Sequence, residues 1–181
     1  VTKGNTKAVL TVEKVGKVDL PAPDIFFGND KMEVTDTDIY KSDQAFTQGQ
    51  MITVTGIDNL NEWWIDPDFF EKQSDGALKF LPINGDYRVT ANAVLKYFSV
   101  MALKDGKPAK LQDDGTGAIW AIGKGIGKPS VTSSEVGWEP GKALCLAQVA
   151  PKKYQLTLKA GETLKTSGDP EVISFKFFHQ N

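Results

Sequence analysis

A glycine-rich stretch with two lysines, GTGAIWAIGKGIGKPS at residues 115–130, raises the possibility of a phosphate-binding loop. Such a loop needs G-x-x-x-x-G-K-[ST] or G-x-G-x-x-G, placed between a strand and a helix whose first amides hold the phosphates. The first pattern fails because Pro129 follows Lys128 where a hydroxyl residue is required, and the second fails because Lys128 stands at the third glycine position. The next residues, SVTSSEVGWEPG, do not predict a helix. The stretch is therefore interpreted as a loop between strands.

Catalytic residues in a recognisable arrangement are not evident, and we expect that the protein is not an enzyme. The one histidine, His179, lies near the end of the chain, which does not support a Ser-His-Asp or Cys-His assembly. A glycosidase would need two facing carboxylates. Glu62, Asp66 and Asp68 cluster in the sequence, but the two aspartates suit helix capping and the glutamate suits a solvated loop. The single cysteine, Cys145 in ALCLA, is expected to be a small buried apolar residue.

Two short acidic runs resemble pieces of calcium loops. They contain Asp36 with Asp38 and Asp113 with Asp114. Neither run has the glycine and the final glutamate of an EF-hand at the required positions. We expect no cofactor, and a looser surface calcium site remains an open alternative.

Tryptophans in polar surroundings suggest a different chemistry, the binding of sugars without cleavage. A flat aromatic face can stack on the apolar C–H groups of a pyranose ring, while neighbouring polar side chains bind the hydroxyls. Trp63 and Trp64 are adjacent, so on an extended chain one should be buried and the other exposed. Trp120 is expected in the core, whereas Trp138 lies between polar turns. The candidate glycan-binding residues are Trp138, Trp64, Trp63, Lys124, Lys128 and Asn59.

Composition excludes several classes of partner. The chain has 181 residues, 40% of them hydrophobic, and a formal net charge of -2. Lysines alternate with acidic residues and form no basic stripe, so we expect no nucleic-acid partner. The longest apolar runs are far shorter than the roughly 20 residues that span a bilayer, so we expect no transmembrane segment. The chain begins at Val1, and any export signal is expected to be missing from it.

Short segments with period-two alternation of apolar and polar residues predict strands throughout the chain. The expected strands are residues 8–14, 24–27, 51–56, 77–81, 87–92, 96–103, 118–122, 143–147, 154–158 and 172–178. Turn sequences such as PINGD and KDGKP separate them. One short helix is expected at DPDFFEK, residues 66–72, with Phe69 and Phe70 closing one end of the core.

This pattern predicts an all-β fold of antiparallel, immunoglobulin-like β-sandwich modules, two of them in tandem. Residues 1–23 are expected to form an N-terminal strand and a proline-containing linker. The first module is expected at 24–104, before a polar linker that begins at residue 104. The second is expected at 105–181, either as a complete module or as an incomplete one.

Specific motifs of the second half resemble a known family. The segments GAIWAIGKGIGKPS, VGWEPGKAL, KKYQLTLKAGETLK and ISFKFFHQN look like the opening part of a SusE/SusF-type module. These modules belong to glycan-binding surface lipoproteins of Bacteroidetes polysaccharide-utilisation systems. The positions of the family pattern are filled by Gly137, Trp138, Tyr154, Gly161 and residues 175–177. The middle segment is similar to a diverged copy.

The resemblance implies export and a lipid anchor in the parent protein that holds it at the outer-membrane cell surface. It also implies a polysaccharide or oligosaccharide ligand and, as further partners, other outer-membrane glycan-uptake proteins. A spacer or partner-docking module without glycan binding is the alternative. Family modules continue beyond the Phe-Lys-Phe strand, whereas TKGNTKAVLTVEK at the N-terminus resembles a closing strand. Either the ends are fragment boundaries or that first strand completes the sandwich of the last module.

Overall fold

The computed structural model describes residues 22–166 and 173–179 as an all-β protein, and the expected strand at 8–14 lies outside these ranges. The strands of the first half are β1 (Phe26–Phe27), β2 (Asp30–Lys31), β3 (Glu33–Asp36), β4 (Ile39–Phe46), β5 (Met51–Ile52), β6 (Val54–Thr55), β7 (Trp64–Ile65), β8 (Phe70–Lys72), β9 (Leu78–Phe80), β10 (Gly85–Asn92), β11 (Tyr97–Lys104) and β12 (Lys107–Pro108). Those of the second half are β13 (Trp120–Gly127), β14 (Glu135–Gly137), β15 (Leu144–Cys145), β16 (Ala147–Ala150), β17 (Lys153–Gln155) and β18 (Ser174–Phe178). One short α-helix, α1 (Val131–Ser134), and the 3-10 turns η1 (Leu60–Glu62) and η2 (Pro140–Lys142) complete the described elements. The predicted fold class, antiparallel β-sandwich, is confirmed.

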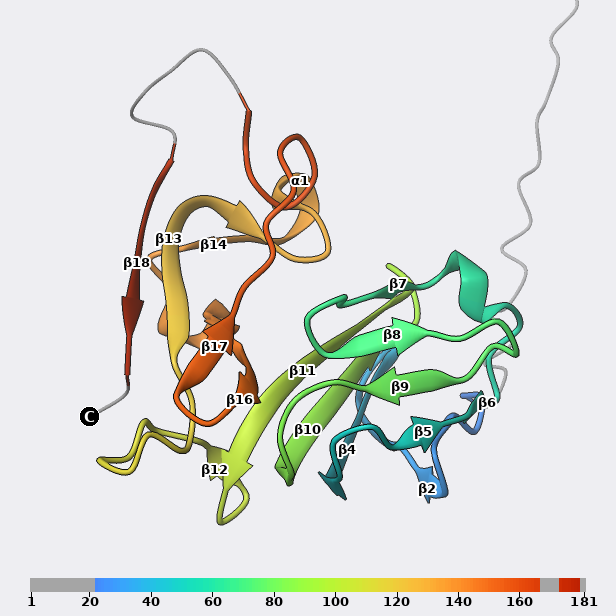
Figure 1. Ribbon diagram of the computed structural model, residues 1–181. Coiled ribbons are helices and arrows are strands. Elements are labelled where there is room, and N and C mark those ends of the chain that lie inside the picture. The colour runs from blue at the N-terminus through green and yellow to red at the C-terminus, as the bar shows by residue number, and fades with distance from the viewer. Residues whose placement is uncertain (1–21, 167–172, 180–181) are drawn as a thin grey trace, which may run out of the picture.

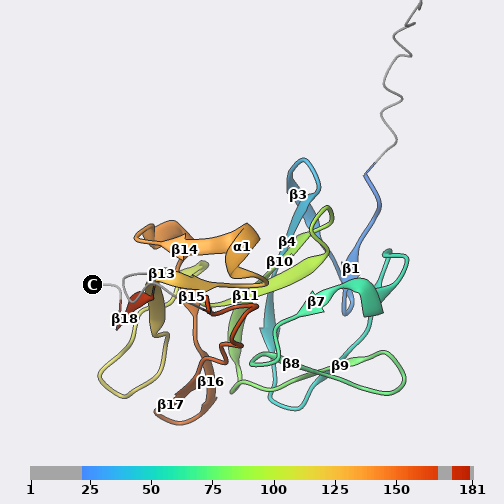
Figure 2. The ribbon, with the colours of Figure 1, turned by 90° about the horizontal axis from the view of Figure 1, so that it is seen from above.

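The first module is a sandwich of two layers. One layer is the sheet β12-β11-β10-β4-β3, which β7 extends by pairing in parallel with β11. The other layer consists of the small sheets β5-β9-β8 and β2-β1-β6. In Figure 1, β8, β9 and β5 lie in front of β10, β11 and β4, and Figure 2 shows the same arrangement from above.

Aromatic side chains fill the space between the layers. Phe27 lies at the centre, with ring centroids 5.3 Å from Phe98, 5.5 Å from Phe70 and 6.1 Å from Phe46. Edge-on and tilted contacts of this kind add to the stabilisation that burial of the rings provides. Alternation along the strands explains this arrangement. Every second residue of β10 from Tyr87 onward is buried, and Phe98 and Val100 of β11 are buried in the same way.

The longest strand that sequence reasoning missed is β4, at the middle of the large sheet. Its sequence IYKSDQAF has an inward face of Tyr40, Ser42, Gln44 and Phe46, and the two polar members obscure the period-two pattern. The turn before it holds Asp36 and Asp38, which form a hairpin corner in which Asp38 adopts a φ of 59°.

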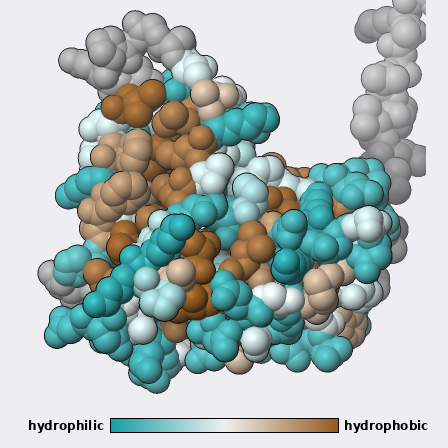
Figure 3. All heavy atoms as spheres, in the orientation of Figure 1, coloured by the Kyte–Doolittle hydropathy of each residue, from teal (hydrophilic) through white to brown (hydrophobic). Residues whose placement is uncertain are grey.

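The second module is thinner than the first. Its sheet joins β13 to β14 and β15 on one side and to β18 on the other. A smaller hydrophobic cluster around Ile122 and Ile126 is covered by Tyr154 of β17 and by Leu156 and Leu158 of the single ribbon that follows it. Figure 3 shows hydrophobic atoms at the surface in the region where β18 and this ribbon lie.

The glycine-rich stretch is a strand, not the expected loop. β13 continues through Gly127, and its glycines allow neighbouring backbones to come close. A Cβ atom on Gly123, where φ is +142°, would lie 2.2 Å from the backbone oxygen of Ser174. One on Gly127 would lie 2.4 Å from the backbone oxygen of Ser134. The glycines of β13 therefore allow the backbones beside it, at Ser174 and Ser134, to pack closely against this strand.

The two modules share the larger hydrophobic core. Trp120, Cys145 and Ala147 of the second module belong to the same buried cluster as Phe27 and Phe98 of the first. The indole of Trp120 donates to the carbonyl of Ala109 at 3.1 Å. Trp120 and Cys145 are thus buried as expected, and burial raises the pKa of the Cys145 thiol to about 12.

A buried ionic cluster also joins the modules. The ammonium of Lys128, whose side chain is only 6% exposed, lies 2.8 Å from Asp66 and 2.7 Å from Asp68. Asp68 is fully buried and also accepts hydrogen bonds from Gln155 and from the backbone and hydroxyl of Thr157. We call Lys128, Asp66 and Asp68 the interface triad.

The two carboxyls of the interface triad differ in their electrostatics. Burial raises the pKa of Asp66, and the charge of Lys128 offsets this only in part. For Asp68, burial also acts to raise the pKa, but Lys128 and the hydrogen bonds from Thr157 outweigh it and hold the pKa below its usual range. Asp68 is therefore the carboxylate that the fold stabilises in its charged form.

The expected helix at 66–72 is wrong. Residues 67–69 form a turn, and β8 begins at Phe70. Asp66 does cap this turn, since its carboxylate accepts from the backbone of Asp68 at 3.0 Å. Phe69 and Phe70 are both buried in the core, as expected. The helix forms instead at α1, where none was expected, and Ser130 caps it.

Replacing Lys128 by methionine is expected to lower the free energy of unfolding by about 3–5 kcal/mol, because two carboxylates would remain buried without a counter-charge. Urea unfolding measures the change. Lys124→Met is the matched control, since Lys124 is exposed on the same strand and should change stability by less than about 0.5 kcal/mol. Equal effects of the two substitutions would contradict this role.

The contribution of Asp68 is expected to depend on pH. Its folded pKa is lowered, so the stability that it provides is present above its unfolded pKa of about 3.9 and is lost as pH falls through the folded value. The free energies of unfolding of the protein and of Asp68→Asn should therefore differ most near neutral pH. The difference should shrink below about pH 4. A difference that stays constant on acidification would show that the charge of Asp68 does not matter.

Candidate functional site

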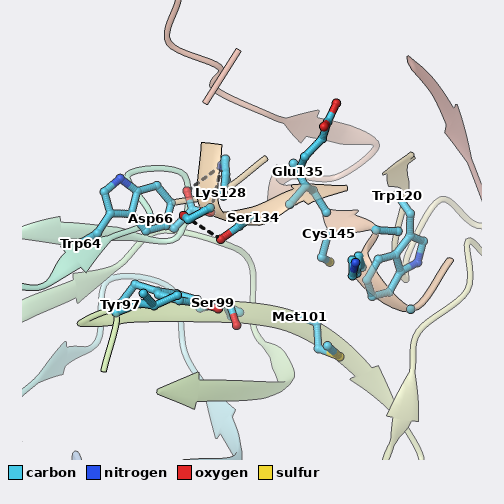
Figure 4. Close-up of a pocket in the computed structure, with 17 residues that line it drawn as sticks. Trp64, Asp66, Tyr97, Ser99, Met101, Trp120, Lys128, Ser134, Glu135 and Cys145 are labelled. Atoms are coloured by element: carbon cyan, nitrogen blue, oxygen red, sulfur yellow. Dashed lines mark hydrogen bonds and ion pairs between the residues drawn. The ribbon is translucent and has the colours of Figure 1, made fainter. Parts of the chain in front are cut away.

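A cleft of about 410 Å³ lies between the two modules, directly beside the interface triad. Asp66 and Lys128 line it at one end and Trp120 at the other, as Figure 4 shows. Its volume falls within the range of roughly 300–1,000 Å³ that is usual for small-molecule sites. The cleft is the candidate functional site of this chain.

The first module contributes an aromatic floor. On β11, Phe98 and Val100 face the core, so the alternate residues Tyr97, Ser99 and Met101 face the cleft. Trp64 is the register partner of Tyr97 on the parallel strand β7, which places the two side chains next to each other. The backbone N–H of Trp64 donates to the carbonyl of Lys96 at 2.8 Å and fixes this position. Trp64 and Tyr97, both half-buried, form what we call the aromatic pair.

The second module contributes a polar wall. Ser133 and Ser134 of α1 line the cleft together with Glu135 and Lys142. One oxygen of Glu135 accepts from the backbone of Gly125 at 2.8 Å, which fixes the carboxylate. The α1 turn exists because the chain leaves β13 after Gly127 and must return along it as β14. The cleft therefore has an aromatic side and a hydroxyl-bearing side from different modules.

Several polar groups of the cleft are available to a ligand. Ser99 is exposed and Trp64 and Tyr97 are half-buried where they line the cleft, so the hydroxyl of Ser99 and the polar edges of the two aromatic side chains can meet a ligand. Most charged groups of the cleft have protein partners, since Lys128 lies 2.8 Å from Asp66, Lys142 lies 2.9 Å from Glu139, and Glu135 accepts from the backbone of Gly125. The arrangement suits an uncharged ligand that has both flat apolar faces and hydroxyl groups.

The adjacent tryptophans face opposite ways, as expected, although Trp64 is half-buried and not exposed. Trp63 is 6% exposed and stacks on Phe98 with ring centroids 4.7 Å apart. Trp64 points the opposite way, into the cleft. Trp63 is therefore a core residue that offers no free face to a sugar, and of the two only Trp64 remains a candidate.

Trp138 is exposed, as a ligand platform would require, but it does not line the cleft. Its side chain is 49% exposed, and the ammonium of Lys176 lies 5.9 Å from its ring centroid. The lysine beside Trp138 thus comes from β18.

The remaining predicted residues have other surroundings. Lys128 is buried in the interface triad, so it is not the free donor that was expected, because two carboxylates already bind its ammonium. Lys124 is exposed on β13. Asn59 caps η1, accepting from the backbone of Asn61 at 3.1 Å and donating to Glu62 at 3.2 Å. Asn59 therefore has a structural role outside the cleft.

Sequence reasoning missed most of the cleft residues. Tyr97 and Ser99 belong to KYFSVMAL, which was identified as a strand, and its alternation marks both as residues of one face. Ser134 and Glu135 had no comparable signal, because only the packing of two modules brings them to β11.

Metal and membrane sites receive no structural support within the described ranges. No three His, Cys, Asp or Glu side chains gather there in a way that could hold a metal ion. None of the helices in that part of the chain is long and apolar enough to cross a membrane.

Comparison with known proteins identifies two families. Residues 114–181 match the family described as Domain of unknown function (DUF5121). No curated protein and no solved structure matches the chain. Residues 11–111, more than half of the chain, match the family described as Domain of unknown function (DUF5125). The chain therefore belongs to the DUF5125 family.

Proposed function

We propose that this protein binds an oligosaccharide or a stretch of polysaccharide in the cleft between its modules, without cleaving it. The observation that carries the proposal is the aromatic pair. Trp64 and Tyr97 lie side by side on paired strands, half-buried, at the floor of the cleft. Two neighbouring aromatic side chains provide a surface on which apolar faces of sugar rings can stack.

The polar wall complements this surface. Hydroxyls of Ser99, Ser133 and Ser134 and the carboxylate of Glu135 lie around the same cavity. A site that combines apolar and aromatic walls with a few fixed polar groups is the usual form of a small-molecule site. Sugar hydroxyls are donors and acceptors at once, so they can bond to all of these groups.

Binding without hydrolysis is supported by the state of the carboxylates. A glycosidase needs one free carboxyl as acid and another as base or nucleophile. Among the described residues that line the cleft, the acidic ones are Asp66 and Glu135. Both oxygens of Asp66 accept from Lys128, at 2.8 and 2.9 Å. A carboxylate whose two oxygens are both occupied by a lysine is a structural group with no oxygen free to reach a ligand.

The place of action is proposed from the family resemblance. Motifs of the second module, among them Gly137-Trp138 and SFKFF, resemble those of SusE/SusF-type surface lipoproteins. We accordingly propose that the parent protein is exported and tethered at the bacterial cell surface, where it captures glycan for a polysaccharide-utilisation system.

Affinity electrophoresis tests the proposal. The chain is run through gels containing starch, pullulan, xylan, mannan or host-type glycans, and retardation by at least one of them is expected. Tyr97→Ala and Trp64→Ala should each weaken binding at least tenfold, since loss of a central aromatic contact commonly costs about 2 kcal/mol or more.

Trp138→Ala is the matched control, because Trp138 is an aromatic residue outside the cleft. It should leave retardation unchanged. Loss of binding in Trp138→Ala alone would move the glycan site to the surface beside Lys176. Absence of retardation in every gel would favour a spacer or partner-docking module instead.

A further inference from the structure

The cleft between the modules has two chemically different ends, which Figure 4 shows. The aromatic pair lies at one end, together with the ion pair of Lys128 and Asp66. Met101, Cys145 and Trp120 lie at the other end, and we call these three residues the apolar end of the cleft. A ligand that fills the whole cleft must therefore match an aromatic, polar environment and an apolar one.

The hydrogen-bonding groups of the apolar end are already engaged. The indole N–H of Trp120 donates to the carbonyl of Ala109 at 3.1 Å. The sulfur of Cys145 accepts from the backbone N–H of Ala102 at 3.5 Å. Burial raises the pKa of this thiol to about 12, so it stays uncharged at neutral pH. Met101 is only partly buried, and its thioether presents a soft apolar surface to the cleft.

The two ends lie further apart than the width of one sugar ring. Tyr97, Ser99 and Met101 follow one another on the face of β11 that lines the cleft. At about 3.3 Å per residue, the step of four residues from Tyr97 to Met101 spans roughly 13 Å. A sugar that stacks on the aromatic pair therefore leaves the apolar end to a neighbouring sugar of the same glycan.

An unsubstituted sugar fits the apolar end poorly. Its hydroxyls would exchange water for carbon and sulfur atoms, and burial of a polar group without a partner is costly. A methyl group carried by the sugar would instead gain free energy from burial at this end. An acetyl group combines such a methyl with a carbonyl oxygen. Ser99 lies between the two ends on β11, and its exposed hydroxyl can donate to that oxygen.

We propose that the ligand of the cleft is a glycan whose sugars carry acetyl groups, and that the apolar end binds the acetyl methyl. This inference rests on the proposed function, because it concerns which glycan the same cleft selects. One sugar stacks on the aromatic pair, while the acetyl group of its neighbour contacts Met101 and Trp120. N-acetylated amino sugars and O-acetylated sugars both present this chemistry.

Two matched pairs of oligosaccharides test the selectivity, by isothermal titration calorimetry of the full chain. Chitotetraose and cellotetraose share their linkage and differ in the N-acetyl amino group that replaces one hydroxyl of each sugar. O-acetylated xylotetraose and xylotetraose differ only in the acetyl esters. In at least one pair the acetylated member should bind at least about tenfold more tightly, the usual lower value of one methyl-sized group in an apolar pocket. The pair that shows the gain identifies the amide or the ester as the source.

Met101→Gln tests the role of the apolar end, because it keeps the length of the side chain and places an amide where the methyl should bind. The ratio of affinities within the responding pair should fall at least about fivefold. Met51→Gln is the matched control. Met51 is 51% exposed on β5 of the first module, away from the residues that line the cleft, so its replacement should leave the ratio unchanged.

The outcomes separate this inference from the proposed function. Binding of both members of a pair with equal affinity, or a ratio that Met101→Gln leaves unchanged, would overturn the selection of acetyl groups while glycan binding stands. Retardation in gels only by glycans without acetyl groups would overturn it in the same way. Absence of binding to all four oligosaccharides and of retardation in every gel would overturn both proposals.

Discussion

The interface triad is the interaction on which the arrangement of the two modules depends. Lys128 comes from the end of β13, whereas Asp66 and Asp68 belong to a turn of the first module. Two buried carboxylates around one ammonium are costly to separate, because each unpaired charge would keep its desolvation penalty. Ion pairs are also directional, so the triad fixes orientation more strictly than the shared apolar core around Trp120 does. The cleft exists because this orientation is fixed.

The strand pattern decides what the cleft contains. Asp66 is separated from Trp64 by a single residue, so the contact that holds the modules together also sets the aromatic pair at the edge of their interface. Alternation then sends Trp63 into the core and Trp64 out of it. A shift of one residue in the pairing of β7 with β11 would exchange the two and leave the cleft without its tryptophan. The site and the core are thus two faces of the same strands.

Sequence reasoning identified the fold class and most strands because buried and exposed residues alternate clearly in segments such as YRVTAN and KYFSVMAL. The prediction was wrong in segments whose local sequence pattern differs from the structure that packing gives them. β4 carries Ser42 and Gln44 on its inward face, and the glycines of β13 look like a loop because they serve close backbone packing. DPDFFEK has the capping residues of a helix, yet burial of both phenylalanines in the sandwich turns it into a strand start.

The cleft could not be derived from the sequence for a related reason. Its two walls lie far apart in the chain, and they are brought together by the interface triad and by the shared core around Trp120. Lys128 lies 62 positions after Asp66 and 60 positions after Asp68 in the chain. A single sequence gives no sign that residues so far apart will form ion pairs. A cleft held rigid in this way loses little freedom when a ligand enters, and such preorganisation favours affinity. The same contact occupies both oxygens of Asp66, so the carboxylate that holds the modules together is not free to contact a ligand in the proposed glycan site.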